Sequence, residues 1–222
     1  TPKPSSAASD VYKRQDFTYV AMLANTPTVL AVGADSPYRS LPELVDAAAV
    51  QADKIAFSTA GEGSDNYQVL ELLQQATGVK MLHVPYKSGN ESLTAVMSRN
   101  TDVTAVSAVT AVGFIEAGQI RPFAVTSSRR LANLPDIPTV KEVLGKEAEG
   151  GSLSGIAVPA ATPAEIVARL NAAISVVAAS PSVQEKIYAR GSEPVDRSQE
   201  AFARKVVEEQ KKWAGILAGV RK

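Results

Sequence analysis

The sequence predicts an α/β fold in which parallel sheets are flanked by helices, arranged as two domains. Short apolar segments rich in β-branched residues alternate with helical patterns of about 10 to 15 residues between residues 17 and 126, which is typical of βαβ units. These segments are apolar on both faces, as strands are when helices cover both sides of a sheet. The last third of the chain is mainly helical, and this change of pattern favours a second domain.

The composition excludes several classes of protein. The 222 residues are 45% hydrophobic and 21% charged, as in a globular protein. Lysine plus arginine and aspartate plus glutamate both total 23, so no electrostatic attraction to nucleic acid is expected. Cysteine is absent, which excludes disulfides, thiolate metal sites and a cysteine nucleophile. The longest uncharged apolar run, residues 103–115, is shorter than the roughly 20 residues that cross a bilayer.

The individual elements follow from apolar periodicity and from capping residues. Ser40, Thr162 (followed by Pro163) and Ser198 are expected to cap helices, and Gly118 is expected to end one. The expected strands are 17–24 and 28–34 (separated by Asn25-Thr26-Pro27), 54–57, 81–84, 102–107, 121–126 and 154–158. The expected helices follow Ser40, run through 69–76, 90–99 and to about 117, and lie at 141–148, 166–177, 182–189 and 202–220. Residues 1–15 show no period and are expected to be a foreign or truncated end, with a flexible native tail as the alternative.

One β-loop-α-β unit, residues 54–84 with the turn that follows, carries the strongest indication of a site. Its glycine-rich turn, residues 58–64, and the segment Pro85-Tyr86 both follow strand ends, the edge at which open parallel sheets bind ligands. Glycines allow close approach of a ligand, and a helix start favours an anion. The alternative is that Gly61 and Gly63 only make a tight turn and that Ser64 or Asp65 caps the helix. Glu62 and Asp65 oppose anion capture unless they point away or meet an amine.

Signatures of enzymes are absent. The sequence Gly61-x-Gly63 lacks the third glycine of a dinucleotide fingerprint, and Ser64 lies in EGSDN rather than in G-x-S-x-G. The single histidine, His83, cannot build a zinc site of the common kinds. It could act as a general base, but a structural histidine hydrogen-bonded at the sheet edge is the favoured interpretation. No catalytic residue, metal site or cofactor is therefore expected.

Five segments together resemble the Bug/TctC family, the extracytoplasmic solute receptors of tripartite tricarboxylate transporters. They are FSTAGEGSDN, GVKMLHVPYKS, DVTAVS, EAGQIRPFAVTSSRR and LPDIPTVKE, and the resemblance covers residues 16–222. It implies a two-domain, type II periplasmic-binding-protein-like fold that clamps a small carboxylate: a dicarboxylate, tricarboxylate, acidic amino acid or aromatic acid. It also implies a periplasmic location, a signal peptide upstream of a truncated start, membrane transporter subunits as partners, no membrane span of its own, and no chemistry on the ligand.

The resemblance assigns both the site and the domains. Its ligand-binding positions fall at Ser58, Thr59, Gly61, Gly63, Ser64, Pro85, Tyr86 and Ser107. Tyr67, Ser88 and Arg99-Asn100-Thr101 depart from the family pattern, which affects the ligand contacts more than the fold. The expected division is 1–15 as the unpatterned end, 16–28 as a crossover strand, 29–150 as the ligand-binding second domain, and 151–222 as the C-terminal part of an incomplete first domain.

Two other functions stay open. The chain could be the effector-binding domain of a transcription regulator, or a hydrolase with Ser64 as nucleophile. If the first domain is incomplete, we expect an unpaired sheet edge, exposed apolar surface and weak stability.

Overall fold

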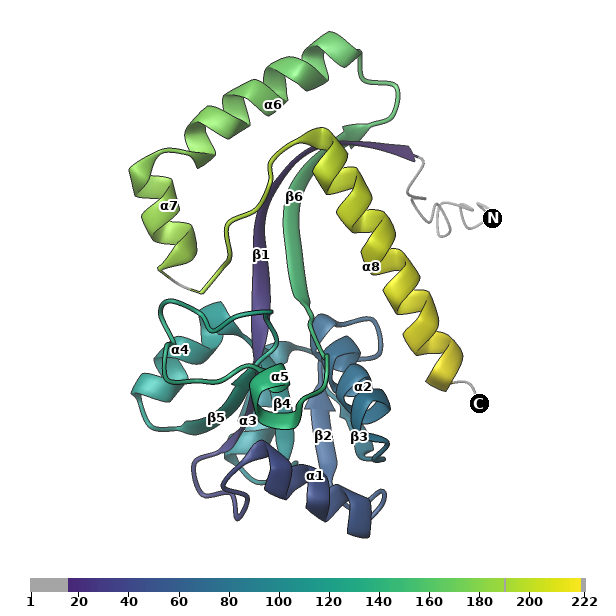
Figure 1. Cartoon of the computed structure of the whole chain (residues 1–222), viewed down its shortest axis with the longest axis vertical. Helices are drawn as coiled ribbons and strands as arrows, with labels where there is room; N and C mark the ends of the chain where they lie inside the picture. Colours follow the sequence, from purple (N-terminus) through teal and green to yellow (C-terminus); the bar gives the residue numbers. More distant parts are fainter. Residues whose placement is uncertain (1–15, 190, 221–222) are drawn as a thin grey trace, which may run out of the picture.

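The computed structural model describes residues 16–189 and 191–220, with side chains as far as Ile216. The expectation for residues 1–15 lies outside the described residues. A six-stranded sheet runs through the molecule, in the order β3-β2-β4-β1-β5 with β6 paired to β1 (Figure 1).

Strands and helices alternate along most of the described chain, as the sequence predicts. The strands are β1 (Phe17–Gly33), β2 (Ala56–Thr59), β3 (Leu82–Pro85), β4 (Val103–Ser107), β5 (Ile120–Val125) and β6 (Gly151–Pro159). The helices are α1 (Leu41–Val50), α2 (Asp65–Thr77), α3 (Gly89–Met97), α4 (Ala108–Glu116), α5 (Val140–Leu144), α6 (Ala164–Ala178), α7 (Pro181–Tyr188) and α8 (Gln199–Val220). The expected helices and the other expected strands are present with boundaries shifted by a few residues, whereas the two strands expected at 17–24 and 28–34 form one strand.

The sheet is mixed rather than wholly parallel. Strand β2 is parallel to β3 and β4, as expected, whereas β1 is antiparallel to β4, β5 and β6. The cause is that β1 enters the sheet at the edge where β4 and β5 end, so it has to run in the opposite direction. The α/β fold class is confirmed, and the prediction of parallel sheets holds for β2, β3 and β4 only.

Strand β1 is a single strand of 17 residues, so the prediction of two strands separated by Asn25-Thr26-Pro27 is wrong. Pro27 lies where β1 changes its partners: the ladder with β6 reaches Pro27 opposite Gly151, and the ladder with β4 begins at Thr28 opposite Ser107. A proline has no N–H to donate and is tolerated where a ladder ends. A sequence typical of a turn therefore continues as a strand.

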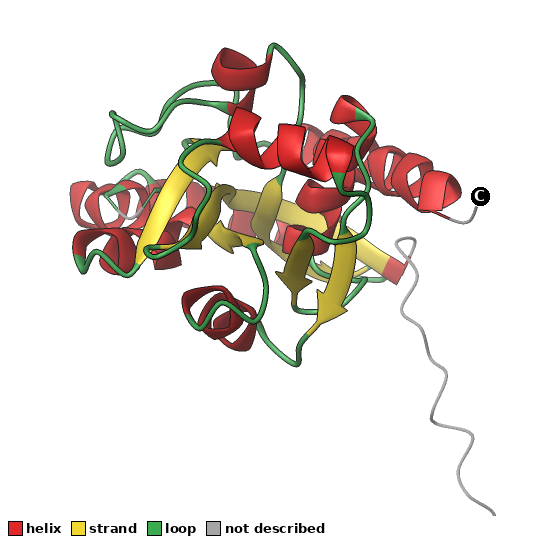
Figure 2. Ribbon diagram, turned by 90° about the horizontal axis from the view of Figure 1, so that it is seen from below, coloured by secondary structure: helices red, strands yellow, loops and turns green. Residues whose placement is uncertain are grey.

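Residues 28–150 form what we call the sheet lobe, whose helices lie on both sides of the sheet (Figure 2). Alternate residues of β1 point to opposite faces: Leu30 and Val32 lie in one apolar cluster, and Val29 and Ala31 in another. These four strand residues are fully buried. The lobe therefore has a closed core on each face of its sheet.

Residues 17–27 and 151–216 form what we call the arm. Figure 1 shows β1 and β6 rising from the lobe as a two-stranded ribbon, with α6 across its far end, α7 turning back beside it and α8 returning toward the lobe. Helix α8 begins after Ser198, whose hydroxyl accepts the N–H of Ala201 at 3.2 Å, as predicted. The predicted cap at Thr162 is wrong, because α6 begins one residue later, after Pro163, without a side-chain cap.

None of the described helices is by itself long and apolar enough to cross a membrane. Helices α6 and α7, separated by a bend of 77°, pass that test of length and composition only as a pair.

Candidate functional site

Three parallel strands of the sheet lobe end at one edge, and each leads into a helix. Strand β2 leads through residues 60–64 into α2, β3 through 86–88 into α3, and β4 directly into α4. In the register of the sheet, Thr59 lies beside Pro85, and Ser58 lies beside Thr104 of β4. The structure therefore brings the three predicted groups of site residues, at 58–64, 85–86 and 107, to the same edge.

The loop after β2 is organised around Gly61 and Ser64. Gly61 has φ of 100°, a conformation that favours glycine, and its N–H donates to Thr59 Oγ1 at 3.0 Å. The Ser64 hydroxyl donates to the carbonyl of Gly61 and accepts the N–H of Tyr67 at 3.3 Å. Ser64 is thus the N-cap of α2, as one of the alternatives predicted. Gly63 is exposed, and a Cβ added to it would have no neighbouring atom within 4 Å.

Ser58 and Thr59 have no exposed surface, and both already have partners. The Ser58 hydroxyl donates to the carbonyl of Ser92 at 2.9 Å, which ties β2 to α3. Thr59 Oγ1 lies 2.6 Å from His83 Nε2. In this structure the two side chains hold the loop in place, and neither hydroxyl is exposed to solvent.

His83 lies in an aromatic cluster beneath the loop. Its ring stacks on Phe57 with centroids 4.9 Å apart, and Tyr67 lies 4.8 Å away on α2. Burial lowers the pKa of the imidazole, and the nearby charge of Glu62 opposes that shift in part. The hydrogen bond to Thr59 and the stacking are what the predicted structural role requires.

Tyr67, one of the departures from the family pattern, is a buried phenol. Burial, then the charges of Glu71 and Glu62 and a hydrogen bond with Glu71, raise its pKa to about 12. Burial also raises the pKa of Glu71, while hydrogen bonds from Gln74 and Tyr67 lower it. Tyr67 is therefore neutral across the physiological range and completes the packing around His83.

The other two strand ends present backbone groups. The N–H of Tyr86 donates to the carbonyl of Thr59 at 2.8 Å, so the turn after β3 is held to β2, and Pro85 is exposed. Helix α3 is capped by the Ser88 hydroxyl. Ser107 precedes α4 but makes no side-chain cap bond, which leaves the first N–H groups of α4 without a side-chain acceptor.

The two acidic residues of the loop have different surroundings. Glu62 is exposed. Asp65 accepts the hydroxyl of Ser152 on β6 at Oδ2 and the N–H of Asn66 at Oδ1, 3.0 Å away. Asp65 thus meets a hydroxyl rather than the amine that the sequence analysis considered. No local pattern could reveal a partner 87 positions away.

The serine hydrolase alternative gains no support from this geometry. The Ser64 hydroxyl is bonded to Gly61, and His83 is bonded to Thr59; no hydrogen bond joins Ser64 and His83. A serine nucleophile needs a base within hydrogen-bond reach. Among residues 16–189 and 191–220, no three histidine, aspartate or glutamate side chains are grouped to hold a metal ion.

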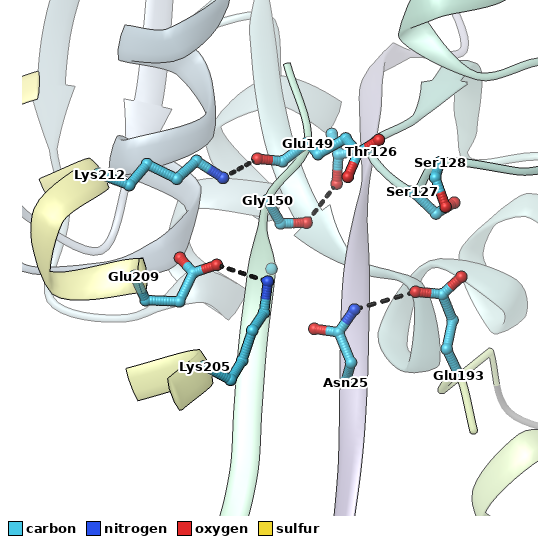
Figure 3. A pocket seen from close by; sticks show the side chains of 11 residues that line it. Asn25, Thr126, Ser127, Ser128, Glu149, Gly150, Glu193, Lys205, Glu209 and Lys212 are labelled. Carbon is cyan, nitrogen blue, oxygen red and sulfur yellow. Dashed lines mark hydrogen bonds and ion pairs between the residues drawn. The ribbon is translucent and has the colours of Figure 1, made fainter. Parts of the chain in front are cut away.

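A second, polar pocket of about 140 Å³ lies where the arm meets the sheet lobe (Figure 3). The sequence analysis missed it, because its residues come from separate segments: Asn25, Thr126, Ser127, Ser128, Glu149, Gly150, Gly151, Glu193, Lys205, Glu209 and Lys212. Lys205 Nζ forms an ion pair with Glu209 Oε1 at 3.2 Å. Lys212 donates to the backbone carbonyl of Glu149, and burial lowers the pKa of Lys212. Both lysines are thus engaged by the protein's own oxygens.

Comparison with known proteins gives a consistent result. The family model described as "Tripartite tricarboxylate transporter family receptor" matches residues 8–221. A Pseudomonas protein from the tcbD-tcbE intergenic region is 31% identical over 93% of this chain, and BugT of Bordetella pertussis is 25% identical over 91%. The chain spans 62% of the length of each of these relatives.

Solved structures resemble this one closely. A Rhodopseudomonas palustris protein with adipate is 29% identical with a TM-score of 0.84, over 94% of this chain and 70% of that one. MatC from the same organism, with bound malate, is 28% identical with a TM-score of 0.81, and the match covers 94% of this chain and 73% of MatC. The periplasmic binding protein BugD is 27% identical with a TM-score of 0.80, over 91% and 69%.

Proposed function

Since the chain belongs to the tripartite tricarboxylate transporter receptor family, we propose that it is a solute receptor for a small carboxylate. The family is one of receptors and not of enzymes. The observation that carries the proposal is the convergence of α2, α3 and α4, whose N-termini start at one sheet edge. Helix N-termini offer free N–H donors and a partial positive charge to an anion.

The proposed contacts are mainly backbone groups and neutral side chains. The exposed part of the loop at Gly63 and the uncapped start of α4 at Ser107 offer donors to a carboxylate, and Gly61 shapes the loop through its bond to Thr59. Pro85 and Tyr86 form a wall beside them. Ser64 contributes chiefly by shaping the loop as the cap of α2, and Ser58 and Thr59 support it from beneath. Hydrogen bonds to a charged group are about twice as strong as neutral ones, so a few donors suffice.

The proposed ligand class is a dicarboxylate. The two similar structures whose ligands are known contain adipate and malate, both four- to six-carbon acids with two carboxylates. We assign one carboxylate to the edge just described. The second carboxylate requires an opposing surface.

We propose that residues 29–150 form the domain that carries this edge, that residues 16–28 cross over, and that 151–222 contribute to the other domain. The arm supports this division, because its apolar groups are exposed: Val176 and Val177 are 73% and 60% exposed, and Ile166 is 42% exposed. Such a surface is covered in a complete domain. The relatives are longer than the matched part, and residues corresponding to their additional segment would supply the cover and the opposing half of the site.

We further propose a periplasmic location and delivery of the ligand to membrane transporter subunits. The family description and the periplasmic BugD support this assignment. Fractionation of cells that express the gene, followed by detection of the receptor with an antibody, tests the location. Recovery in the cytosol alone would contradict it.

Ligand binding is tested by titration calorimetry and thermal shift with adipate, malate, citrate, glutamate and benzoate. The measurements use this chain and a chimera that adds the N-terminal segment of the adipate-bound R. palustris protein. We expect a dicarboxylate to raise the melting temperature of the chimera, and no binding by the 222-residue chain alone. If none of these acids binds the folded chimera, the proposed ligand class is wrong.

A further inference from the structure

The carboxylate of Asp65 joins the ligand-binding loop to the arm. Asp65 is the first residue of α2 and directly follows the loop at residues 60–64. Its Oδ2 accepts the hydroxyl of Ser152, the second residue of β6, and its Oδ1 accepts the N–H of Asn66. Both oxygens are thus occupied within the chain, although the residue lies beside a site that we assign to an anion.

The strand that Asp65 meets is held tightly at this point. The N–H of Gly150 donates to the carbonyl of Thr126 at 3.0 Å, and the Thr126 hydroxyl donates back to the carbonyl of Gly150 at 2.7 Å. A Cβ on Gly150 would lie 2.5 Å from Val69 of α2, so β6 begins in direct contact with that helix. Ser152 is therefore a fixed point relative to α2.

The same short segment belongs to the ribbon that connects the lobe with the arm. Ser152 pairs with Thr26 of β1, and Thr26 Oγ1 lies 2.8 Å from the hydroxyl of Ser192. Beyond these residues β1 and β6 leave the sheet lobe (Figure 1). A bond to Ser152 thus connects α2 to the ribbon, in addition to the covalent chain.

We propose that Asp65 is a positioning residue: its bond to Ser152 fixes the orientation of the ligand-binding loop relative to the ribbon. This inference rests on the proposed function for its effect on affinity. The proposed loop donor at Gly63 lies two residues from Asp65, so movement at the start of α2 displaces it directly. The two hydrogen bonds also partly compensate a negative charge beside the proposed anion site.

A simpler role for Asp65 would be that of any acidic residue in the first turn of a helix, where it interacts with the helix dipole. Glu43 in the first turn of α1 provides the matched control, since it is exposed and its carboxylate bonds only locally, to the N–H of Arg39. Glu43→Ala removes a first-turn charge without breaking a link to the ribbon. A change that occurs in Asp65→Ala but not in Glu43→Ala is therefore due to loss of the hydrogen bond between Asp65 and Ser152.

The experiment compares Asp65→Ala, Ser152→Ala, the double variant, Ser152→Thr and Glu43→Ala. Amide hydrogen exchange of residues 60–67 is measured on the 222-residue chain without ligand. We expect Asp65→Ala and Ser152→Ala each to accelerate exchange in this segment more than tenfold, with no further change in the double variant. Ser152→Thr keeps the hydroxyl and should restore protection, and Glu43→Ala should not affect it.

Affinity is measured on the chimera with adipate and malate. We expect the two alanine variants to weaken binding fivefold to tenfold, non-additively, while the melting temperature of each ligand-free variant changes no more than that of Glu43→Ala. Unchanged exchange and unchanged affinity in both alanine variants would overturn the positioning role. If the unmutated chimera binds no acid, the proposed function fails, whereas the exchange data still decide whether Asp65 orders the loop.

Discussion

The sheet lobe and the arm contain helices of similar amphipathic pattern, but α2 of the lobe buries its apolar face, whereas α6 and α7 of the arm leave most of theirs exposed. Helix α2 buries Val69, Leu70 and Leu73. Helix α6 buries only Val167 and Ala178, and no residue of α7 is buried. The difference shows that the pattern of a sequence specifies which face a helix would bury, whereas its partner in space decides whether that face stabilises the fold.

A matched pair of leucines measures this difference most directly. Leu70 in α2 is fully buried, and Leu170 in α6 is 37% exposed. We expect Leu70→Ala to lower the free energy of unfolding by about 2–5 kcal/mol, because it leaves a cavity in the core. Leu170→Ala should cost less than about 1 kcal/mol in this chain. Urea denaturation of both variants measures the difference. Equal losses would mean that the arm has a core of its own.

The junction between the two regions is expected to tolerate little change. Gly151 has φ of 153°, and a Cβ there would lie 2.3 Å from the carbonyl oxygen of Thr26. Gly151→Ala should destabilise the chain by about 1–3 kcal/mol through backbone strain. Gly113→Ala is the control, since it lies within α4 with open space around it and should stabilise by up to about 1 kcal/mol. Thermal unfolding compares the two, and a neutral Gly151→Ala would show that the ribbon adapts.

Two serines at helix starts provide a smaller test. The Ser64 hydroxyl accepts the N–H of Tyr67 and caps α2 in the lobe. Ser180 precedes α7 in the arm, and its hydroxyl donates to Val177 without capping the helix. Ser64→Ala should cost about 1 kcal/mol, and Ser180→Ala a few tenths at most. Chemical denaturation distinguishes them; a larger loss for Ser180→Ala would contradict the assignment of the cap.

The smallest expected effect is a pH dependence confined to the lobe. Burial lowers the pKa of His83, so the unfolded chain binds a proton at a higher pH than the folded chain does. Stability should therefore fall as the pH drops below the ordinary histidine value of 6.5 and level off below the lowered pKa. Because His83 is the only histidine, His83→Gln isolates its contribution. Unfolding midpoints are measured for the unmutated chain and for His83→Gln between pH 7.5 and 5. The two midpoints should converge as the pH falls.

The sequence predicts the lobe better than the connection to the arm, and the reasons are physical. The unit β2-α2-β3 was predictable because its strand periods, glycine turn and Ser64 cap are all local signals. Strand β1 was not, because Asn25-Thr26-Pro27 is typical of a turn and continues as a strand only through its pairing with β6. The start of β6 at Gly151 was missed for the same reason.

The candidate site divides in the same way. Its location at the strand ends followed from the sequence, since glycines and helix starts mark such an edge. The partners of its side chains did not, because Ser58 to Ser92 and Asp65 to Ser152 are contacts between distant segments. The role of the eight predicted residues in ligand binding stays a prediction that the titrations above test.

The unbroken course of β1 has a mechanical consequence. The strand that pairs with β6 in the arm continues into the interior of the sheet, where it lies between β4 and β5 rather than at an edge. Any load that bends or twists the arm is therefore applied to the middle of the lobe's sheet. Pro27, which has no N–H to donate, lies at the position along the strand where the partner changes from β6 to β4.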